Sequence, residues 1–315
     1  MTRGVLLLVA AAALAILFNF GNNYALRLAT TLAMYVTLAT AWNIIGGFAG
    51  YPSFAHAAFF GLGAYASGVI LSVGVPLSVA WTGAGLVTAA FSLGLGVILL
   101  QLRGHYFAIG SLVVADVLRE ITNSWTSLTG GGMGMNLPLI TGGGTVQARF
   151  FFFAMSVLAL AAYLVSSRID AGRLGVALRC IEQNEDAAEA IGINTRRAKV
   201  AAFATSSVFV GVAGAIYASW VTYIDPSDVY DVSLSVKPII MALLGGAGTV
   251  TGPVIGAAVF VVLEELIWRN SLEFHTGLLG LLIVALVLFL PGGLAQIRGL
   301  GLARWLDRHP QKERT

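Results

Sequence analysis

The charged side chains of this chain are concentrated in one segment, residues 167–199. This segment carries eleven of the 18 basic and 15 acidic side chains found in all 315 residues. Side chains of both signs at this density can form ion pairs with another protein surface in water. The first half of the segment predicts an amphipathic helix, because four apolar residues repeat at i, i+3, i+4 and i+7. These residues are Leu174, Ala177, Leu178 and Ile181.

A second, shorter helix is predicted over residues 185–191. Asn184 is a suitable N-cap, and acidic side chains on the first turn suit the helix dipole. Gly192 is placed to end the helix in a left-handed conformation. Two turns of helix are not stable alone in water, so we expect this one to dock on another surface. The residues expected to form that contact are Glu185, Asp186, Ala187, Ala188, Glu189 and Gly192.

The sequence contains no pattern that suggests catalysis. It has no nucleophile–base set, no HExxH pair and no Walker A glycine pattern before a lysine. A single cysteine, Cys180, excludes an intramolecular disulfide and a Cys-rich zinc site. A net charge of +3 is too small to indicate nucleic-acid binding. We therefore expect no catalytic residue, no metal and no cofactor in this chain.

The elements that must position the charged segment are membrane-spanning helices. Hydrophobic residues make up 57% of the chain and charged residues 10%, against about 25% charged in soluble domains. This composition excludes a soluble globular enzyme and a disordered chain. A spanning helix needs roughly 17–25 mainly apolar residues. Such windows predict an all-α polytopic bundle of about ten spans that forms a single transmembrane domain over 1–315. The spans are 4–20, 28–48, 57–73, 77–101, 105–121, 149–166, 200–223, 234–250, 253–268 and 276–291.

Two of these spans are unusual, and basic residues orient the whole set. The span 105–121 contains Asp116 and Arg119, which can pair one turn apart, and 234–250 is interrupted by glycine; either can be short, broken or re-entrant. With both termini in the cytoplasm, thirteen basic residues lie inside and five outside. The span 4–20 is interpreted as an uncleaved first helix. The basic tail 292–315 is expected at the cytoplasmic lipid surface.

Two regions are candidates for lining a transport path. The first is the glycine-rich turn between the second and third spans, and the second is the uncharged segment 122–148, which has seven glycines. Unwound helix ends can line a path, and an uncharged lining suits a zwitterion with an apolar side chain. Close helix packing and an ordinary flexible loop are the alternatives, and they stay open. The candidate residues are Ser53, His56, Phe59, Phe60, Gly61, Thr129, Gly130 and Gly131.

In several runs, from residues 43–65 near the start to 290–294 near the end, the sequence resembles the branched-chain amino acid permeases of ABC importers, the LivM and LivH type. The run Asp186-Ala187-Ala188-x-x-x-Gly192 is similar to the cytoplasmic "EAA" motif of ABC permeases, with Asp in place of Glu. The motif's downstream hydrophobic and proline positions are not matched. The other runs are 43–65, 106–109, 123–131, 179–185 and 290–294. They follow the family's order along most of the chain, and they resemble LivM more than LivH.

The resemblance implies a non-enzymatic permease subunit in a bacterial inner membrane that forms half of a path for leucine, isoleucine and valine. It implies a second, LivH-like permease and an extracytoplasmic substrate-binding protein. It also implies two cytoplasmic ATPases, which bind ATP and Mg and receive the helix 185–191. A permease for urea, amides or other amino acids is an alternative. So is an ion-gradient-driven secondary transporter, although that would leave the segment 167–199 without a role.

Overall fold

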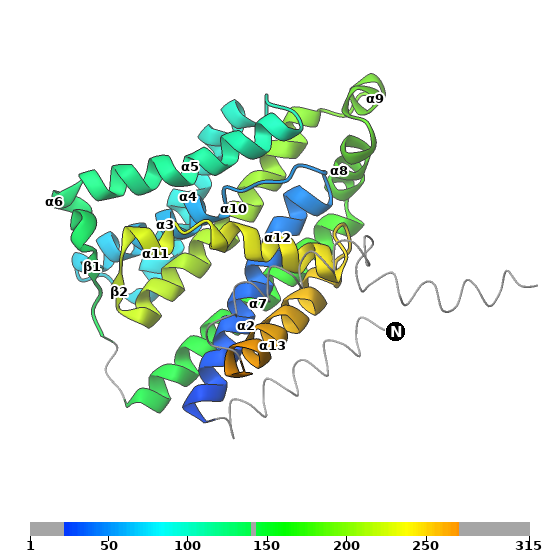
Figure 1. Cartoon of the computed structure of the whole chain (residues 1–315). Helices are drawn as coiled ribbons and strands as arrows, with labels where there is room; N and C mark the ends of the chain where they lie inside the picture. Colours follow the sequence, from blue (N-terminus) through cyan, green and yellow to red (C-terminus); the bar gives the residue numbers. More distant parts are fainter. Residues whose placement is uncertain (1–21, 140–142, 271–315) are drawn as a thin grey trace, which may run out of the picture.

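The structure, a computed structural model, describes residues 22–139 and 143–270, and these are mostly helical (Figure 1). The predicted spans 4–20 and 276–291 and the tail 292–315 lie outside the described residues. Within the described ranges, four helical stretches are long and apolar enough to cross a membrane. They are α2 (Asn23–Trp42) continued by η1 (Asn43–Gly47), α4 (Leu77–Leu99), α7 (Gly144–Ala171) and α10 (Thr195–Val221). The predicted all-α membrane class is confirmed.

The other long helices test the two unusual spans. They are α3 (His56–Ser72), α5 (His105–Ser124), α12 (Ser233–Gly245) and α13 (Gly252–Asn270). The helix α12 is short, as predicted, because its 13 residues extend only about 20 Å. The helix α5 is continuous over 20 residues, so this span is not broken, and its being re-entrant stays a prediction.

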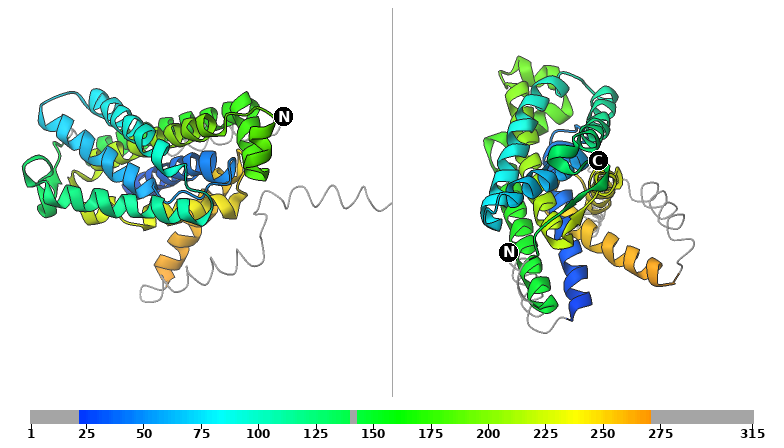
Figure 2. Two further views of the ribbon diagram at one scale, coloured as in Figure 1. Left: turned by 90° about the horizontal axis from the view of Figure 1, so that it is seen from above. Right: turned by 90° about the vertical axis from the view of Figure 1, so that its left-hand side faces the viewer.

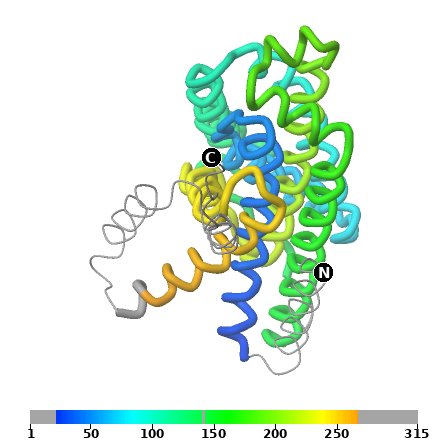
Figure 3. The backbone as a smooth tube through the Cα atoms, turned by 90° about the vertical axis from the view of Figure 1, so that its right-hand side faces the viewer, coloured from blue at the N-terminus to red at the C-terminus, as the bar shows by residue number. Residues whose placement is uncertain are grey.

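Shorter elements gather at the two ends of the bundle (Figure 1). One end holds α6 (Thr126–Thr129), η2 (Gly131–Met133) and α11 (Pro226–Val229). It also holds strand β1 (Met135–Asn136), which pairs antiparallel with β2 (Tyr223–Ile224). The opposite end holds α8 (Arg173–Gln183) and α9 (Glu185–Ala190). Figure 3 views the bundle from the side of α8 and α9, with the dark-blue start of α2 at the bottom of the picture.

The helix α10 is the central element, since it packs against both α3 and α4 and runs from the α9 end to the β2 end. Glycines let these helices approach closely: a Cβ built on Gly214 would lie 2.1 Å from the carbonyl oxygen of Phe60, and one on Gly63 would lie 2.1 Å from that of Gly211. The helix α2 packs mainly on α7, and α13 projects from the bundle (Figure 2). Close packing by small residues is therefore observed at the α3–α10 crossing.

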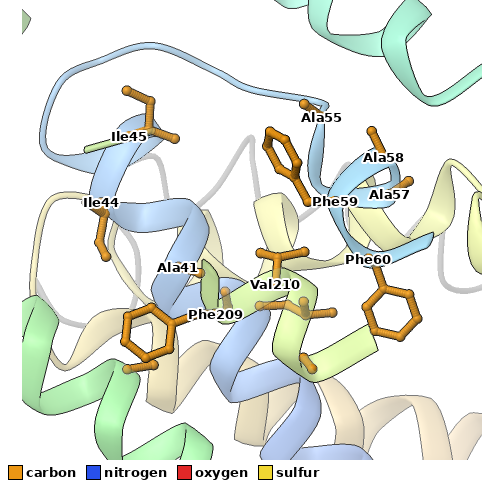
Figure 4. Packing of buried hydrophobic residues seen from close by; sticks show 14 of the residues in the cluster. Ala41, Ile44, Ile45, Ala55, Ala57, Ala58, Phe59, Phe60, Phe209 and Val210 are labelled. Atoms are coloured by element: carbon orange, nitrogen blue, oxygen red, sulfur yellow. The ribbon is translucent and has the colours of Figure 1, made fainter. Parts of the chain in front are cut away.

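Buried hydrophobic side chains pack together where the first turn of α3 meets η1 and α10 (Figure 4). Phe59 and Phe60 leave α3 on different sides, and each is 1% exposed. The ring of Phe59 contacts the ring of Phe203 edge to face, with centroids 5.2 Å apart. The ring of Phe60 lies 5.3 Å from that of Tyr217. These aromatic contacts fix α3 against α10.

Candidate functional site

The short helix predicted over 185–191 is present as α9, and its local capping is as expected. The side-chain oxygen of Asn184 accepts the backbone N–H of Ala187 at 3.0 Å. Gly192 has a φ of +89°, and its N–H donates to the carbonyl of Glu189 at 2.9 Å. The helix ends at Ala190, one residue before the predicted end. Local sequence therefore determines where α9 begins and ends.

A buried polar cluster fastens α9 to the membrane helices. The ammonium group of Lys199, on α10, donates to Glu185 at 2.5 Å, to the hydroxyl of Tyr51 at 3.0 Å and to the carbonyl of Leu100 at 3.1 Å. Tyr51 in turn donates to the Glu185 carboxylate. The Lys199 side chain is 3% exposed and that of Glu185 is 12% exposed. We name Tyr51, Glu185 and Lys199 the anchor cluster; it joins α9, α10 and the loop after η1.

The electrostatics of the anchor cluster favour a charged Glu185. Burial acts to raise the pKa of its carboxyl group, but hydrogen bonds from Lys199 and Tyr51, and the charges of Lys199 and Arg103, lower it more. The pKa of Glu185 therefore lies below its ordinary value. Burial, with the hydrogen bond to the Glu185 carboxylate, raises the pKa of Tyr51. At neutral pH Glu185 is therefore a carboxylate and Tyr51 a neutral phenol, and both lie within hydrogen-bond distance of Nζ of Lys199.

A second ion pair lies outside the anchor cluster and is exposed. The guanidinium of Arg103, which precedes α5, contacts Asp186 at 2.9 Å and Glu185 at 3.8 Å. Side chains of Arg103 and Asp186 are more than half exposed, so this pair contributes little to stability. Its position is informative, however, because it places the start of α5 beside α9.

The predicted contact residues of α9 divide between two faces. Ala188 is 2% exposed and Glu185 belongs to the anchor cluster, so both face their own chain. Asp186, Ala187 and Glu189 are exposed, although Glu189 also accepts a hydrogen bond from Thr195. Gly192 shapes the turn beyond the helix. Beside this exposed face lies Ile191, which is 73% exposed and was not singled out from the sequence as a contact residue.

The amphipathic helix predicted just before α9 is α8, and its apolar face packs inward. Leu178 and Ile181 are buried, and Leu174 and Ala177 are partly buried against the same core. Arg179 donates to Asp170 at 2.5 Å, which ties α8 to the end of α7. The link between α7 and α9 is therefore a packed helix rather than a free loop.

The candidate path residues around the start of α3 come together in the interior of the chain. Ser53 and His56 are 0% and 1% exposed, and Nε2 of His56 lies 3.4 Å from the hydroxyl of Ser206. Phe59 and Phe60 fill the core described above. A Cβ on Gly61 would lie 2.3 Å from the ring of Tyr230. The structure shows these residues in packing contacts, and their role in a path stays a prediction.

The other candidate path residues form a tight turn at the end of the bundle opposite α9. The Thr129 hydroxyl contacts the carbonyls of Thr122 and Trp125, each at 2.7 Å, and accepts the N–H of Gly131 at 3.2 Å. Gly130 has a φ of +77°. The region 122–148 is less open than expected, because α5 extends to residue 124 and α7 begins at 144. A role of this turn in the path also stays a prediction.

One ion pair and one cavity could not be predicted from local sequence patterns. Lys237 on α12 pairs with Glu264 on α13 at 2.7 Å, although 27 positions separate them. A cavity of about 750 Å³ opens near the starts of α2 and α7, with Tyr35, Tyr217 and Trp220 in its lining. Both bring together side chains from different helices, so the periodicity within one helix could not have predicted them.

The pair predicted inside the span 105–121 is present. Asp116 and Arg119 on α5 lie 3.2 Å apart, and both side chains are exposed. A charged side chain at the centre of a bilayer costs about 2.5–3.5 kcal/mol on insertion scales. The pairing reduces this cost but does not remove it, because neither group is buried in protein.

The family model and the related proteins that match this chain share one description. Residues 24–288 match the family model described as "Branched-chain amino acid transport system / permease component". The high-affinity branched-chain amino acid transport system permease protein LivM of Escherichia coli K12 is 27% identical over 92% of this chain and 74% of its own length. The LivH protein of that system in Salmonella typhimurium is 22% identical over 82% of this chain and 90% of its own. No solved structure matches the chain.

Proposed function

The chain belongs to the family of branched-chain amino acid transport permease components, and we propose that it forms half of the membrane path by which an ATP-driven importer moves leucine, isoleucine or valine. Members of this family are permease components and not enzymes themselves. The long apolar helices and the two kinds of permease relative support a multi-pass membrane subunit that works in a pair.

The proposed assembly has four kinds of subunit. A second, LivH-like permease completes the path, and a substrate-binding protein delivers the amino acid from outside. Two ATPases, which bind ATP and Mg, dock at the α8–α9 end. That end then lies in the cytoplasm, as do both termini, in a bacterial inner membrane. The excess of basic residues expected on this side supports the orientation.

The observation that carries the proposal is the anchor cluster. A short helix that cannot be stable alone is held by a buried ion pair to a 27-residue helix that crosses the bundle. A force on α9 is therefore transmitted through Glu185 and Lys199 to α10. Coupling of this kind requires that α9 contacts its partner differently in two states of the path.

Uptake by the whole assembly tests the proposal. The chain is reconstituted with a LivH-like permease, the ATPases and the binding protein, and labelled leucine is supplied with ATP inside or outside the vesicles. We expect uptake only when ATP reaches the ATPase side and none when the ATPases are left out. Leucine uptake by the permeases alone under a proton or sodium gradient would instead identify an ion-driven transporter.

The exposed side chain of Ile191 provides a direct test of the docking face. We expect Ile191→Asp to weaken ATPase binding at least tenfold, because a charge would replace an exposed apolar side chain at the end of α9. ATPase co-purification with the permease pair measures this binding.

The matched control is Val73→Asp, which introduces the same charge. Val73 directly follows the last residue of α3, and its side chain is 78% exposed. It should leave ATPase binding unchanged. Equal ATPase binding by wild-type and Ile191→Asp protein would show that α9 is not the docking element.

A further inference from the structure

Within the part of the chain that the structure describes, α5 packs against other elements along one side only. Its buried residues are spaced as one face of a helix: Phe107, Ser111, Ala115, Leu118 and Thr122. The opposite side exposes large apolar residues at the same spacing: Tyr106, Ile109, Val113, Val117 and Ile121. Because Arg103 contacts α9 and α6 follows Ser124, α5 runs from the α9 end to the β1–β2 end. Among residues 22–139 and 143–270, no other segment covers the opposite face of this helix, which extends from one end of the bundle to the other.

Three charged residues distinguish this face from the other exposed faces. Asp116 and Glu120 are exposed and lie four positions apart, so they share the uncovered side of α5. Arg119 pairs with Asp116 and is itself 42% exposed. By contrast, α4 contains no charged residue and α7 contains none between 150 and 167. Lipid can cover the exposed faces of α4 and α7, but charges on a spanning helix belong beside water or protein.

A shallow hollow lies on this face around Glu120. It has a volume of about 580 Å³ and is lined by Val117, Glu120, Ile121, Ser124 and Trp125. Within the part of the chain that the structure describes, the Glu120 carboxylate has no ion-pair or hydrogen-bond partner. The hollow therefore combines one carboxylate with aliphatic and aromatic surface, in the half of α5 away from α9.

These observations lead to one inference, which rests on the proposed function. We propose that the uncovered face of α5 is a wall of the water-filled path, with the second permease subunit across from it, and that Glu120 binds the ammonium group of the passing amino acid. Val117, Ile121 and Trp125 then contact its apolar side chain. A carboxylate matches an ammonium group with a charge-assisted hydrogen bond. The site lies in the half of the path that substrate enters from the binding protein.

Thiol labelling tests whether the face is wet. In the assembled transporter, with Cys180 replaced by serine, a charged, membrane-impermeant methanethiosulfonate is applied to Val117→Cys and to the control Leu86→Cys. Leu86 is 72% exposed on α4 and, like Val117, lies about 10–14 Å from the end of its helix opposite α9. We expect Val117→Cys to react and Leu86→Cys to stay unmodified. Equal resistance of both positions would overturn the proposal, because α5 would then face lipid or a closed protein contact.

Protection by substrate tests the role of Glu120. Leucine should slow the labelling of Val117→Cys, whereas 4-methylpentanoate, which lacks the ammonium group, should not. Adding Glu120→Gln should raise the leucine concentration that gives half protection about tenfold or more. Equal protection by both compounds, or protection unchanged in the Glu120→Gln background, would remove Glu120 from the site.

The two levels of proposal fail in different ways. An assembly that shows no ATP-dependent uptake with wild-type subunits contradicts the proposed function itself. An assembly that takes up leucine normally, while leucine leaves the labelling of Val117→Cys unaffected, contradicts only the site on α5.

Discussion

Lys199→Met is expected to abolish most ATP-driven uptake while leaving the permease in the membrane. Methionine keeps the length of the side chain but removes the ammonium group that binds Glu185, Tyr51 and Leu100. Glu185 would then be a largely buried carboxylate whose remaining cation is the exposed Arg103, at 3.8 Å. Removing one partner of a buried ion pair typically costs about 3–5 kcal/mol. The remaining contacts of a two-turn helix are too few to offset that free energy, so α9 should detach from α10.

Two measurements follow this change. Leucine uptake by the assembled transporter should fall at least tenfold, and amide hydrogen exchange of residues 185–191 should become faster than in the wild type. Exchange in the rest of α10 should change little, since its other packing contacts remain.

The matched comparison is a double-mutant cycle with Glu185→Gln. Glu185→Gln leaves the buried Lys199 without its carboxylate, and Lys199→Met leaves Glu185 with only the exposed Arg103. The double variant removes both buried charges, so it should recover part of the slow exchange at α9. Additive effects of the two variants would show that Lys199 and Glu185 do not act as a pair. Wild-type uptake and exchange in Lys199→Met would contradict the anchoring role altogether.

Gly214→Ala is expected to destabilise the bundle more than its single added methyl suggests. The new Cβ would lie 2.1 Å from the carbonyl oxygen of Phe60, and the contact is with backbone, which cannot rotate away. The helices α3 and α10 would have to separate, at a cost of about 1–3 kcal/mol or more. We expect the Tm of the purified permease pair to fall by about 5 °C or more.

Gly94→Ala is the matched control for this prediction. Gly94 lies within α4, and a Cβ there would meet nothing within 4 Å. The alanine should leave the Tm unchanged or raise it, because it reduces the freedom of the unfolded chain. Equal Tm values for the Gly214 and Gly94 variants would show that α3 and α10 tolerate a wider spacing than the structure has.

Local sequence was sufficient for the class of protein and for the ends of α9. Hydropathy identified the long apolar helices, and the family resemblance of runs such as 43–65 is confirmed by the match over residues 24–288. Asn184 and Gly192 predicted where α9 begins and ends, because helix capping depends on residues only a few positions apart. The spacing of Leu178 and Ile181 likewise predicted the buried face of α8.

The tertiary structure decided which charged and polar groups are buried and with what. Lys199 was one of eleven charges in a polar segment, and only the fold places it 3% exposed against Glu185 and Tyr51. The fold likewise turned Ala188 inward and left α5 uncovered on its charged side. Hydropathy measures the free energy of moving a side chain out of water. This free energy is similar whether the side chain then contacts lipid or the interior of a protein. Whether a residue contacts lipid, another helix or a path depends on helices brought together from distant parts of the chain.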